Sequence, residues 1–175
     1  MPKWLEPSLC LVNTATALGR ERLILTLFCS CMLSENQVIE AVCLYLRSHG
    51  YRIDQRLTTK QRGHDIIASK DAGNRIELHI EAKGETSDRI GSARHGKGFN
   101  SAQVIDHVAA AFYCAAAMLE SAGADSAVRA GIALPDTKLH RKQISRVSGA
   151  ISMLQIAVFF VGSSGQVTVQ SPWPV

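Results

Sequence analysis

The sequence lacks the cysteine patterns of a disulfide-stabilised or zinc-binding domain. Its 175 residues include five cysteines, an odd number, with no CxxC pair and no cluster of cysteine with histidine. These features argue against a disulfide framework and against a structural zinc site. Cys43 and Cys114 lie within apolar helical patterns, where a reduced cysteine usually packs as a small hydrophobic residue. We therefore expect a reducing, cytoplasmic location.

Sequence motifs of several common enzyme classes are also missing. No G-x-S-x-G sequence or cysteine–histidine pairing indicates a nucleophilic serine or cysteine, and no G-x-x-x-x-G-K-[ST] sequence indicates a nucleotide-binding P-loop. Internal repeats, low-complexity tracts and interdomain linkers are absent, which predicts one main domain. The composition, 46% hydrophobic and 19% charged, is that of a globular protein, and the net charge of +4 permits nucleic-acid binding without requiring it.

The first 31 residues differ from the rest of the chain. Three of the five cysteines lie there, and Arg22 precedes a short apolar run at 23–29. This arrangement has the shape of a signal peptide, but no small-x-small cleavage site follows, and the run is too short to cross a bilayer. We favour the alternative that Met32 is the true start, with residues 1–31 an N-terminal extension or mis-called start and 32–175 the domain. No membrane association is expected.

Hydrophobic periodicity and turn residues predict the order of helices and strands. Ser34 and Gln37 have the spacing of a capping box, and Gly50 is a natural helix stop. Residues 71–74 predict a tight hairpin between antiparallel strands. The expected elements are a helix at 34–50, strands at 51–57, 65–69 and 75–83, a basic glycine-rich loop at 84–100, a helix at 102–119, a strand at 127–134, a helix at 138–154, and strands at 156–161 and 166–170. This order predicts an α/β fold in which a mixed sheet lies between layers of helices.

The strand at 75–83 carries the residues that indicate chemistry. Side chains alternate between the two faces of a strand, so the apolar residues share one face: Leu78, Ile80 and Ala82. The polar residues share the other: Glu77, His79, Glu81 and Lys83. Glu81 and Lys83 are then about 7 Å apart at the C-terminal end of the strand. A lone histidine such as His79 is more often a hydrogen-bonded core residue than a ligand.

The predicted hairpin brings Asp65, at the start of the preceding strand, close to Glu81. Two carboxylates and the Lys83 ammonium group would then meet at one edge of the sheet. Mg²⁺ prefers a few carboxylate oxygens and keeps several waters, and Mn²⁺ is an alternative occupant. A bound divalent cation polarises a phosphoryl group and activates water, and a neighbouring lysine can orient that water or stabilise developing charge. The pattern therefore indicates a metal-dependent phosphodiester hydrolase.

These residues resemble the motif of the PD-(D/E)xK nuclease superfamily, an acid at the start of one strand followed by Glu-x-Lys on the next. The motif reads Gly63-His64-Asp65-Ile66 and Ile80-Glu81-Ala82-Lys83-Gly84, and it departs from the family pattern because His64 replaces the proline before Asp65. The resemblance covers roughly residues 34–134 and implies a restriction endonuclease-like fold, an αβββαβ core with a further helix and strands after it. It implies Asp65 and Glu81 as metal ligands, the Ala82 carbonyl as a third ligand, and Lys83 as the catalytic lysine.

The same resemblance draws attention to two further polar residues near the cluster. Many members add a glutamate from the first helix, and Glu35 is in phase with that helix's apolar stripe, whereas Glu40 is offset towards solvent. Stabilisation of the helix dipole is an equally good explanation for Glu35. Gln103 is similar to a glutamine that some members place near the active site, but a plain polar residue at a helix N-terminus is the alternative we favour slightly.

The basic glycine-rich loop is the predicted contact with the nucleic-acid backbone. Its cationic residues Arg89, Arg94 and Lys97 could bind phosphates, and its glycines would let backbone amides approach them. A solvated loop without a ligand is the alternative. A second basic cluster, Lys138, Arg141, Lys142 and Arg146, has the spacing of an ordinary exposed helix face.

The sequence thus predicts a Mg²⁺-dependent endonuclease that acts on DNA, and a homodimer where both strands are cut. One alternative is a nucleic-acid-binding module that has the same scaffold but does not cleave, because a fold does not determine its chemistry. The other is a small interaction protein in which Glu81 and Lys83 form only a surface salt bridge, worth about 0–1 kcal/mol.

Overall fold

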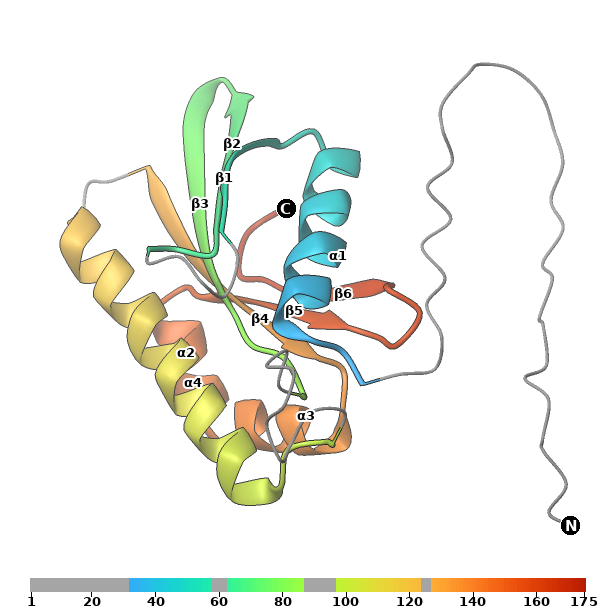
Figure 1. Cartoon of the computed structure of the whole chain (residues 1–175). Helices are drawn as coiled ribbons and strands as arrows, with labels where there is room; N and C mark the ends of the chain where they lie inside the picture. The colour runs from blue at the N-terminus through green and yellow to red at the C-terminus, as the bar shows by residue number, and fades with distance from the viewer. Residues whose placement is uncertain (1–31, 58–62, 87–96, 124–126) are drawn as a thin grey trace, which may run out of the picture.

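The computed structural model describes residues 32–57, 63–86, 97–123 and 127–175 (Figure 1). These residues form one six-stranded mixed sheet with helices on both faces. The helices are α1 (Glu35–Ser48), α2 (Ser101–Ala122), α3 (Lys138–Arg146) and α4 (Ser148–Met153). The strands are β1 (Arg52–Arg56), β2 (Ile66–Ala72), β3 (Asn74–Ala82), β4 (Val128–Pro135), β5 (Ala157–Val161) and β6 (Val167–Gln170). The predicted α/β class and mixed sheet are confirmed; the predictions for residues 1–31 lie outside the described residues.

The strands follow one another across the sheet in sequence order, β1 to β6. The first three form an antiparallel meander, β3, β4 and β5 are parallel, and β6 returns antiparallel to β5. Parallel neighbours need crossover connections. Helix α2 supplies the connection from β3 to β4, and α3 with α4 supplies that from β4 to β5.

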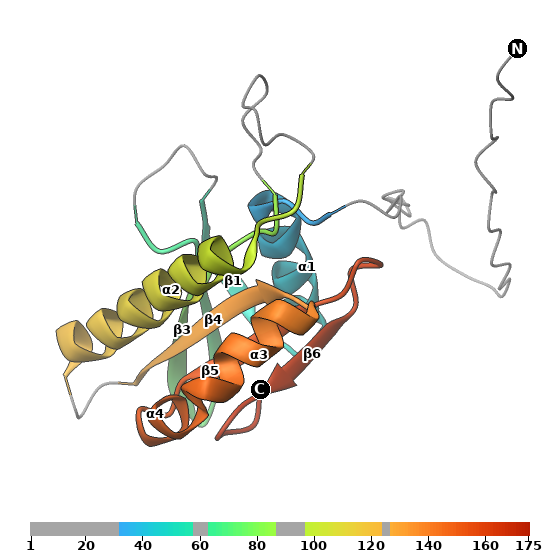
Figure 2. The ribbon, with the colours of Figure 1, turned by 90° about the horizontal axis from the view of Figure 1, so that it is seen from below.

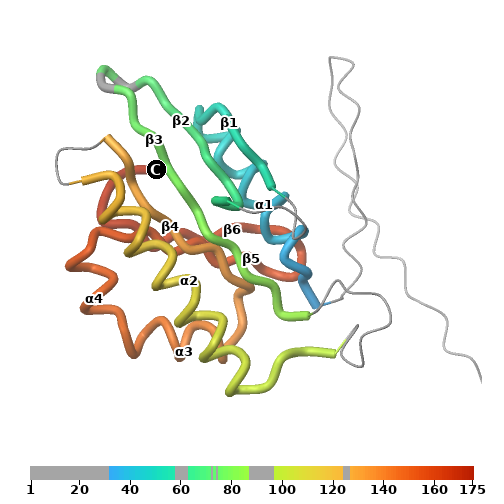
Figure 3. Tube along the Cα trace, turned by 60° about the vertical axis from the view of Figure 1, so that its left-hand side comes forward, coloured from blue at the N-terminus to red at the C-terminus, as the bar shows by residue number. Residues whose placement is uncertain are grey.

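Two apolar cores hold the helices to the sheet, one on each face. Figure 3 shows α1 on one side of the strands and α2, α3 and α4 on the other. The core under α1 includes Leu78, Ile80 and Ala82 of β3, as the strand alternation predicts. The core on the opposite face joins α2, α3 and α4 to residues of β4 and β5 that include Ile132 and Phe160. Figure 2 shows α2 and α3 lying side by side on this face. The polar side chains of β3 therefore point to the face that α2 covers.

Local signals place both ends of α1 where the sequence predicts them. Ser34 and Gln37 form the capping box, with Ser34 Oγ accepting from the Gln37 amide and the Gln37 side chain accepting from the Ser34 amide. At the other end, the Tyr51 amide donates to the Leu46 carbonyl and the Gly50 amide to that of Arg47. Gly50 has a φ of 82°, a backbone conformation that favours glycine. This is the Schellman pattern of a helix C-terminus.

The prediction of one helix over 138–154 is wrong. Two helices, α3 and α4, occupy this segment, and they are separated at Val147, whose φ of −117° and ψ of 11° are not helical. The Val147 amide donates to Ile144, three residues back, and so tightens the last turn of α3. Ser148 and Gly149 follow, and both have lower helix propensity than alanine. The chain can therefore turn here, and Ile151 still reaches the core.

Helix α2 is long and apolar enough to cross a membrane by length and composition, and it is the one such helix among the described residues. Its apolar character comes largely from alanine. One side of the helix is buried, mostly against the sheet and α3. The buried residues are Val104, Val108, Ala111, Ala115 and Met118. A single helix of this kind is weak evidence for a membrane span, because core helices of other proteins satisfy the same criterion.

Candidate functional site

The β2–β3 hairpin places Asp65 beside the end of β3. Ile66 pairs with Ile80 in the antiparallel register, so Asp65, one residue before β2, lies opposite Glu81. The Asp65 Oδ2 atom accepts a hydrogen bond of 2.8 Å from the Ala82 amide. The last residues paired between β2 and β3 at this end are Ile66 and Ile80, so the Ala82 amide lies just beyond the paired region. The Asp65 carboxylate thus adds one more hydrogen bond between the two strands of the hairpin. The predicted approach of Asp65 to the end of β3, near Glu81, is confirmed.

Lys83 joins this group through two carboxylates. Its Nζ donates to Glu81 Oε1 at 2.5 Å and lies 4.0 Å from Glu35 Oε2 on the first turn of α1. The three side chains are 24% exposed or less, so solvent screens their charges only partly. We call Asp65, Glu81, Lys83 and Glu35 the carboxylate–lysine cluster. Glu40 is not part of it, because its carboxylate pairs with Arg56 of β1.

Close backbone packing at Gly84 lets the start of α1 reach Lys83. A Cβ atom at Gly84 would stand 2.5 Å from the Glu35 nitrogen and 2.9 Å from the Ser34 carbonyl carbon, so only glycine fits without displacement. Two hydrogen bonds join the same segments, from the Glu85 amide to the Leu33 carbonyl at 2.8 Å and from the Leu33 amide to Glu85 Oε1 at 2.7 Å. From the sequence, Gly84 has no role beyond its place in the motif and Glu85 is not singled out, because close packing between distant segments leaves no periodic pattern in the sequence.

The electrostatics of the cluster couple its members. Burial raises the pKa of the Asp65 carboxyl, and the nearby Glu81 charge adds to this, while the Ala82 amide and Lys83 oppose it. For Lys83, burial disfavours the charged ammonium, but the hydrogen bond to Glu81 and attraction to Glu81, Glu35 and Asp65 outweigh burial and raise its pKa. Lys83 is therefore a cation at neutral pH. With all four groups ionised, three carboxylates and one ammonium leave the cluster with an excess of two negative charges.

The donor chemistry of the cluster fits a hard divalent cation. In the part of the chain that the structure describes, no three His, Cys, Asp or Glu side chains are grouped as a complete metal site. Two carboxylates and a backbone carbonyl would leave coordination positions to water, which is how Mg²⁺ is commonly bound. Burial is the main cause of the raised pKa of Asp65, and a bound cation would offset both this burial cost and the repulsion from Glu81. The residues present therefore fit Mg²⁺ or Mn²⁺ better than zinc.

The structure describes two of the four predicted nucleic-acid contacts, Lys97 and Gln103. Arg89 and Arg94 lie outside the described residues, and Lys97 is exposed. Gln103 forms the capping box of α2 with Asn100, its side chain accepting from the Asn100 amide at 3.1 Å. The alternative role, a helix N-terminal polar residue, is thus observed for Gln103, and its role in nucleic-acid binding remains a prediction. The helical basic cluster is largely solvent-facing, with Lys138, Lys142 and Arg146 exposed.

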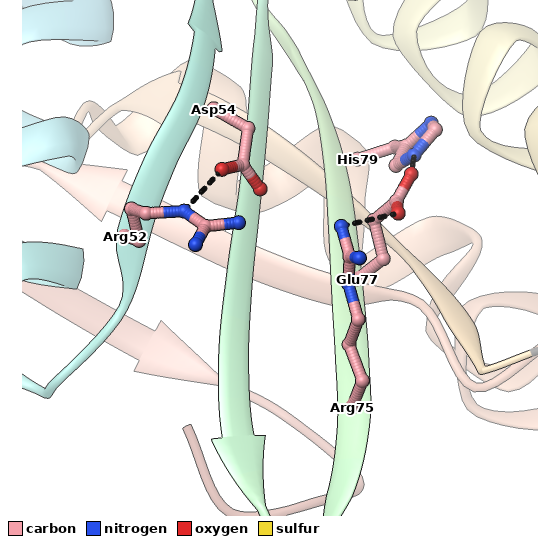
Figure 4. A network of polar contacts seen from close by, with 5 residues as sticks. All are labelled: Arg52, Asp54, Arg75, Glu77 and His79. Carbon is pink, nitrogen blue, oxygen red and sulfur yellow. Dashed lines mark hydrogen bonds and ion pairs between the residues drawn. The ribbon is translucent and has the colours of Figure 1, made fainter.

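His79 is held by a neighbouring ion pair rather than isolated. Its Nε2 lies 2.6 Å from Glu77 Oε1, and the other oxygen of Glu77 lies 3.7 Å from Arg75 (Figure 4). The His79 ring also lies 4.7 Å from that of His64, tilted by 51°. The prediction of a hydrogen-bonded histidine is confirmed, although His79 lines a cleft instead of the core.

This cleft, of about 450 Å³, lies between the C-terminal half of α2 and the polar face of β3. Glu81 belongs to both the cleft and the cluster. Tyr113 and Cys114 of α2 form part of its other wall. In this alanine-rich helix, the sequence predicted only a packing role for Cys114 and did not single out Tyr113. Burial raises the pKa of the Cys114 thiol, so this group is protonated at neutral pH.

The chain was compared with protein-family models, with curated proteins and with solved structures, and none of them matches it.

Proposed function

We propose that the chain is a Mg²⁺-dependent nuclease of the PD-(D/E)xK type, with a restriction endonuclease-like fold, that hydrolyses phosphodiester bonds in DNA. The observation that carries the proposal is the convergence of Asp65, Glu81 and Lys83 at the adjoining ends of β2 and β3. The αβββαβ order of the first six elements, with α1 on one face and α2 on the other, supports it.

Each member of the cluster has a role under this proposal. Asp65 and Glu81, with the Ala82 carbonyl, would hold Mg²⁺ or Mn²⁺. Such a cation polarises the phosphoryl group and lowers the pKa of a bound water. Lys83 would orient the attacking water or stabilise charge on the phosphate oxygens, since its raised pKa keeps it a cation. Glu35 would hold the ammonium in place from α1, 4.0 Å away.

The Glu81–Lys83 hydrogen bond of 2.5 Å has a consequence for this mechanism. Glu81 must share its carboxylate between the cation and Lys83, or release Lys83 towards the substrate. Its two oxygens permit the first arrangement, because Oε1 accepts from Lys83 and Oε2 can face the cation. Glu35 offers Lys83 a second anionic partner in either case.

A nucleic-acid-binding module that does not cleave is the second candidate. The hydrogen bond between Glu81 and Lys83 is compatible with it, because two residues that pair with each other can form a purely structural ion pair with no role in catalysis. In that case, DNA would bind in a salt-dependent manner, and no divalent cation would cause cleavage.

The test is a cleavage panel of linear, supercoiled, branched and single-stranded DNA with Mg²⁺ or Mn²⁺, using the full chain. We expect cleavage that EDTA abolishes and that Glu81→Gln reduces by at least about 10²-fold, the usual scale for removal of a group that stabilises the transition state. Glu120→Gln, an exposed carboxylate of α2, is the matched control and should cleave like the unaltered protein. Cleavage that survives Glu81→Gln or EDTA would overturn the proposal.

A further inference from the structure

The cleft beside the cluster has the size and character of a ligand site. Its volume of about 450 Å³ lies within the range of about 300–1,000 Å³ typical of such sites. Apolar atoms dominate its lining, and the polar groups gather around Glu81 and two histidines. The principal lining residues are His64, His79, Glu81, Tyr113, Cys114 and Met118. A ligand in the cleft would therefore touch the same glutamate that serves the cluster.

Two imidazole rings are held in place at the polar side of the cleft. His64 and His79 lie with ring centroids 4.7 Å apart, and Glu77 fixes His79 through the 2.6 Å contact. Arg75 approaches Glu77 in turn at 3.7 Å, so the ring is the end of a chain of polar contacts along β3 (Figure 4). Flat rings held in this way can stack on another ring with little loss of side-chain entropy.

Tyr113 presents a third ring on the opposite wall. It lines the cleft from α2 and is 73% exposed, which makes it the one aromatic residue among the exposed large hydrophobic side chains of the described residues. A single exposed ring needs no ligand to explain it, but this ring lies on the wall of the cleft opposite the two histidine rings. Tyrosine is suited to contact with a ligand because it offers a large face with few rotatable bonds.

We propose that this cleft binds one unpaired nucleobase of the strand whose phosphate lies at the carboxylate–lysine cluster. The inference rests on the proposed nuclease function and names its substrate class: single-stranded DNA, or DNA with an extruded or unpaired nucleotide at the cleaved bond. Glu81 joins the cleft to the cluster, so a nucleoside in the cleft is placed next to the reacting phosphate. A base offers its faces to aromatic rings only when it is unstacked, so a fully paired duplex cannot fill the site.

The test measures binding without cleavage, so that it does not depend on the proposed chemistry. A fluorescent single-stranded 20-mer and the matching duplex are titrated into the full chain in EDTA, and binding is followed by anisotropy. We expect single-stranded DNA to bind more tightly than the duplex, and Tyr113→Ala to weaken its binding by roughly 5- to 100-fold, the scale of one base–aromatic stack. Tyr113→Phe should retain binding, because the ring is kept.

A second variant fills the cleft instead of removing its wall. Ala117 lines the cleft and is exposed, so Ala117→Trp should fold and exclude a base, with a loss similar to that of Tyr113→Ala. Ala110→Trp is the matched control, since Ala110 is exposed on the same helix and does not line this cleft. Equal binding of single strand and duplex, unchanged by Tyr113→Ala and Ala117→Trp, overturns the cleft assignment. Failure of the unaltered chain to bind either DNA also overturns the cleft assignment. In both cases the nuclease proposal is decided separately, by whether Glu81-dependent cleavage is observed in the presence of Mg²⁺ or Mn²⁺.

Discussion

Replacement of Gly84 by alanine is the sharpest structural test of how the cluster is assembled. Gly84 follows Lys83 and packs against the start of α1. An added Cβ would stand 2.5 Å from the Glu35 nitrogen, 2.9 Å from the Ser34 carbonyl carbon and 3.1 Å from the Leu33 oxygen. All three are backbone atoms, so no side chain can turn away. Either α1 or the segment after β3 must move.

The expected cost follows from the size of this clash. Overpacking of a well-packed site costs about 1–3 kcal/mol, and each kcal/mol shifts the Tm of a domain of about this size by about 2–4 °C. Gly84→Ala should therefore lower the Tm by about 2–12 °C in a thermal unfolding experiment. Because the shift separates Glu35 from Lys83, cleavage should also fall even at temperatures where the protein is folded.

Gly149→Ala is the control, and it should have the opposite sign. Gly149 lies in α4 with no atom within 4 Å of the position of its Cβ. Alanine has the higher helix propensity, by up to about 1 kcal/mol, so the Tm should stay unchanged or rise by a few degrees. A Gly84→Ala protein as stable as the unaltered chain would refute the account of close packing between α1 and the end of β3.

The other predictions concern charge. Asp65→Asn should stabilise the protein at neutral pH, because the raised pKa of Asp65 means that its ionisation costs free energy in the folded state. This gain should disappear as the pH falls below the ordinary titration range of an aspartate, where Asp65 is protonated in both states. Measurements of Tm over a series of pH values test this. If Asp65→Asn lowers the Tm at every pH, its carboxylate is stabilising instead. His140 is 1% exposed, and burial lowers its pKa to about 4, so protonation favours the unfolded chain below pH 6.5. This difference in pKa should lower the free energy of unfolding by about 2 kcal/mol at pH 5. His140→Gln should therefore flatten the dependence of stability on pH between pH 7 and 5. An unchanged slope in His140→Gln contradicts this. Glu35→Gln should reduce cleavage by about 10-fold, whereas Glu40→Gln on the same helix, whose partner is Arg56, should leave it within about 2-fold; equal effects would remove Glu35 from the cluster.

The parts of the site that depend on short-range geometry could be predicted from the sequence. Strand alternation places Glu81 and Lys83 on one face, and the hairpin at Gly73 brings Asp65 beside them, so three residues of the cluster follow from two local rules. Helical phase favours Glu35 over Glu40, but whether Glu35 joins the cluster or only stabilises the helix dipole did not follow from the sequence. Glu35, not Glu40, reaches Lys83, and this depends on the Leu33–Glu85 hydrogen bonds and the space at Gly84.

The remaining differences arise where periodicity is weak or misleading. Ile144, Val147 and Ile151 keep helical spacing through the break between α3 and α4, so apolar periodicity continues where the backbone does not. In α2, alanine occupies both buried and exposed positions, which hides the direction of Tyr113 and with it the cleft. Hydrophobic pattern reports burial, and neither a change in helix direction nor a concave surface alters that pattern enough to be recognised.

The central claim is that the carboxylates of Asp65 and Glu81 hold one divalent cation next to Lys83. Calorimetric titration of the full chain with Mn²⁺ measures this directly, without DNA. We predict one bound ion per chain, binding at least about 10-fold weaker in both Asp65→Asn and Glu81→Gln, and no change in Glu120→Gln. If the unaltered chain binds no Mn²⁺, or if both variants bind it as the unaltered chain does, the claim is wrong.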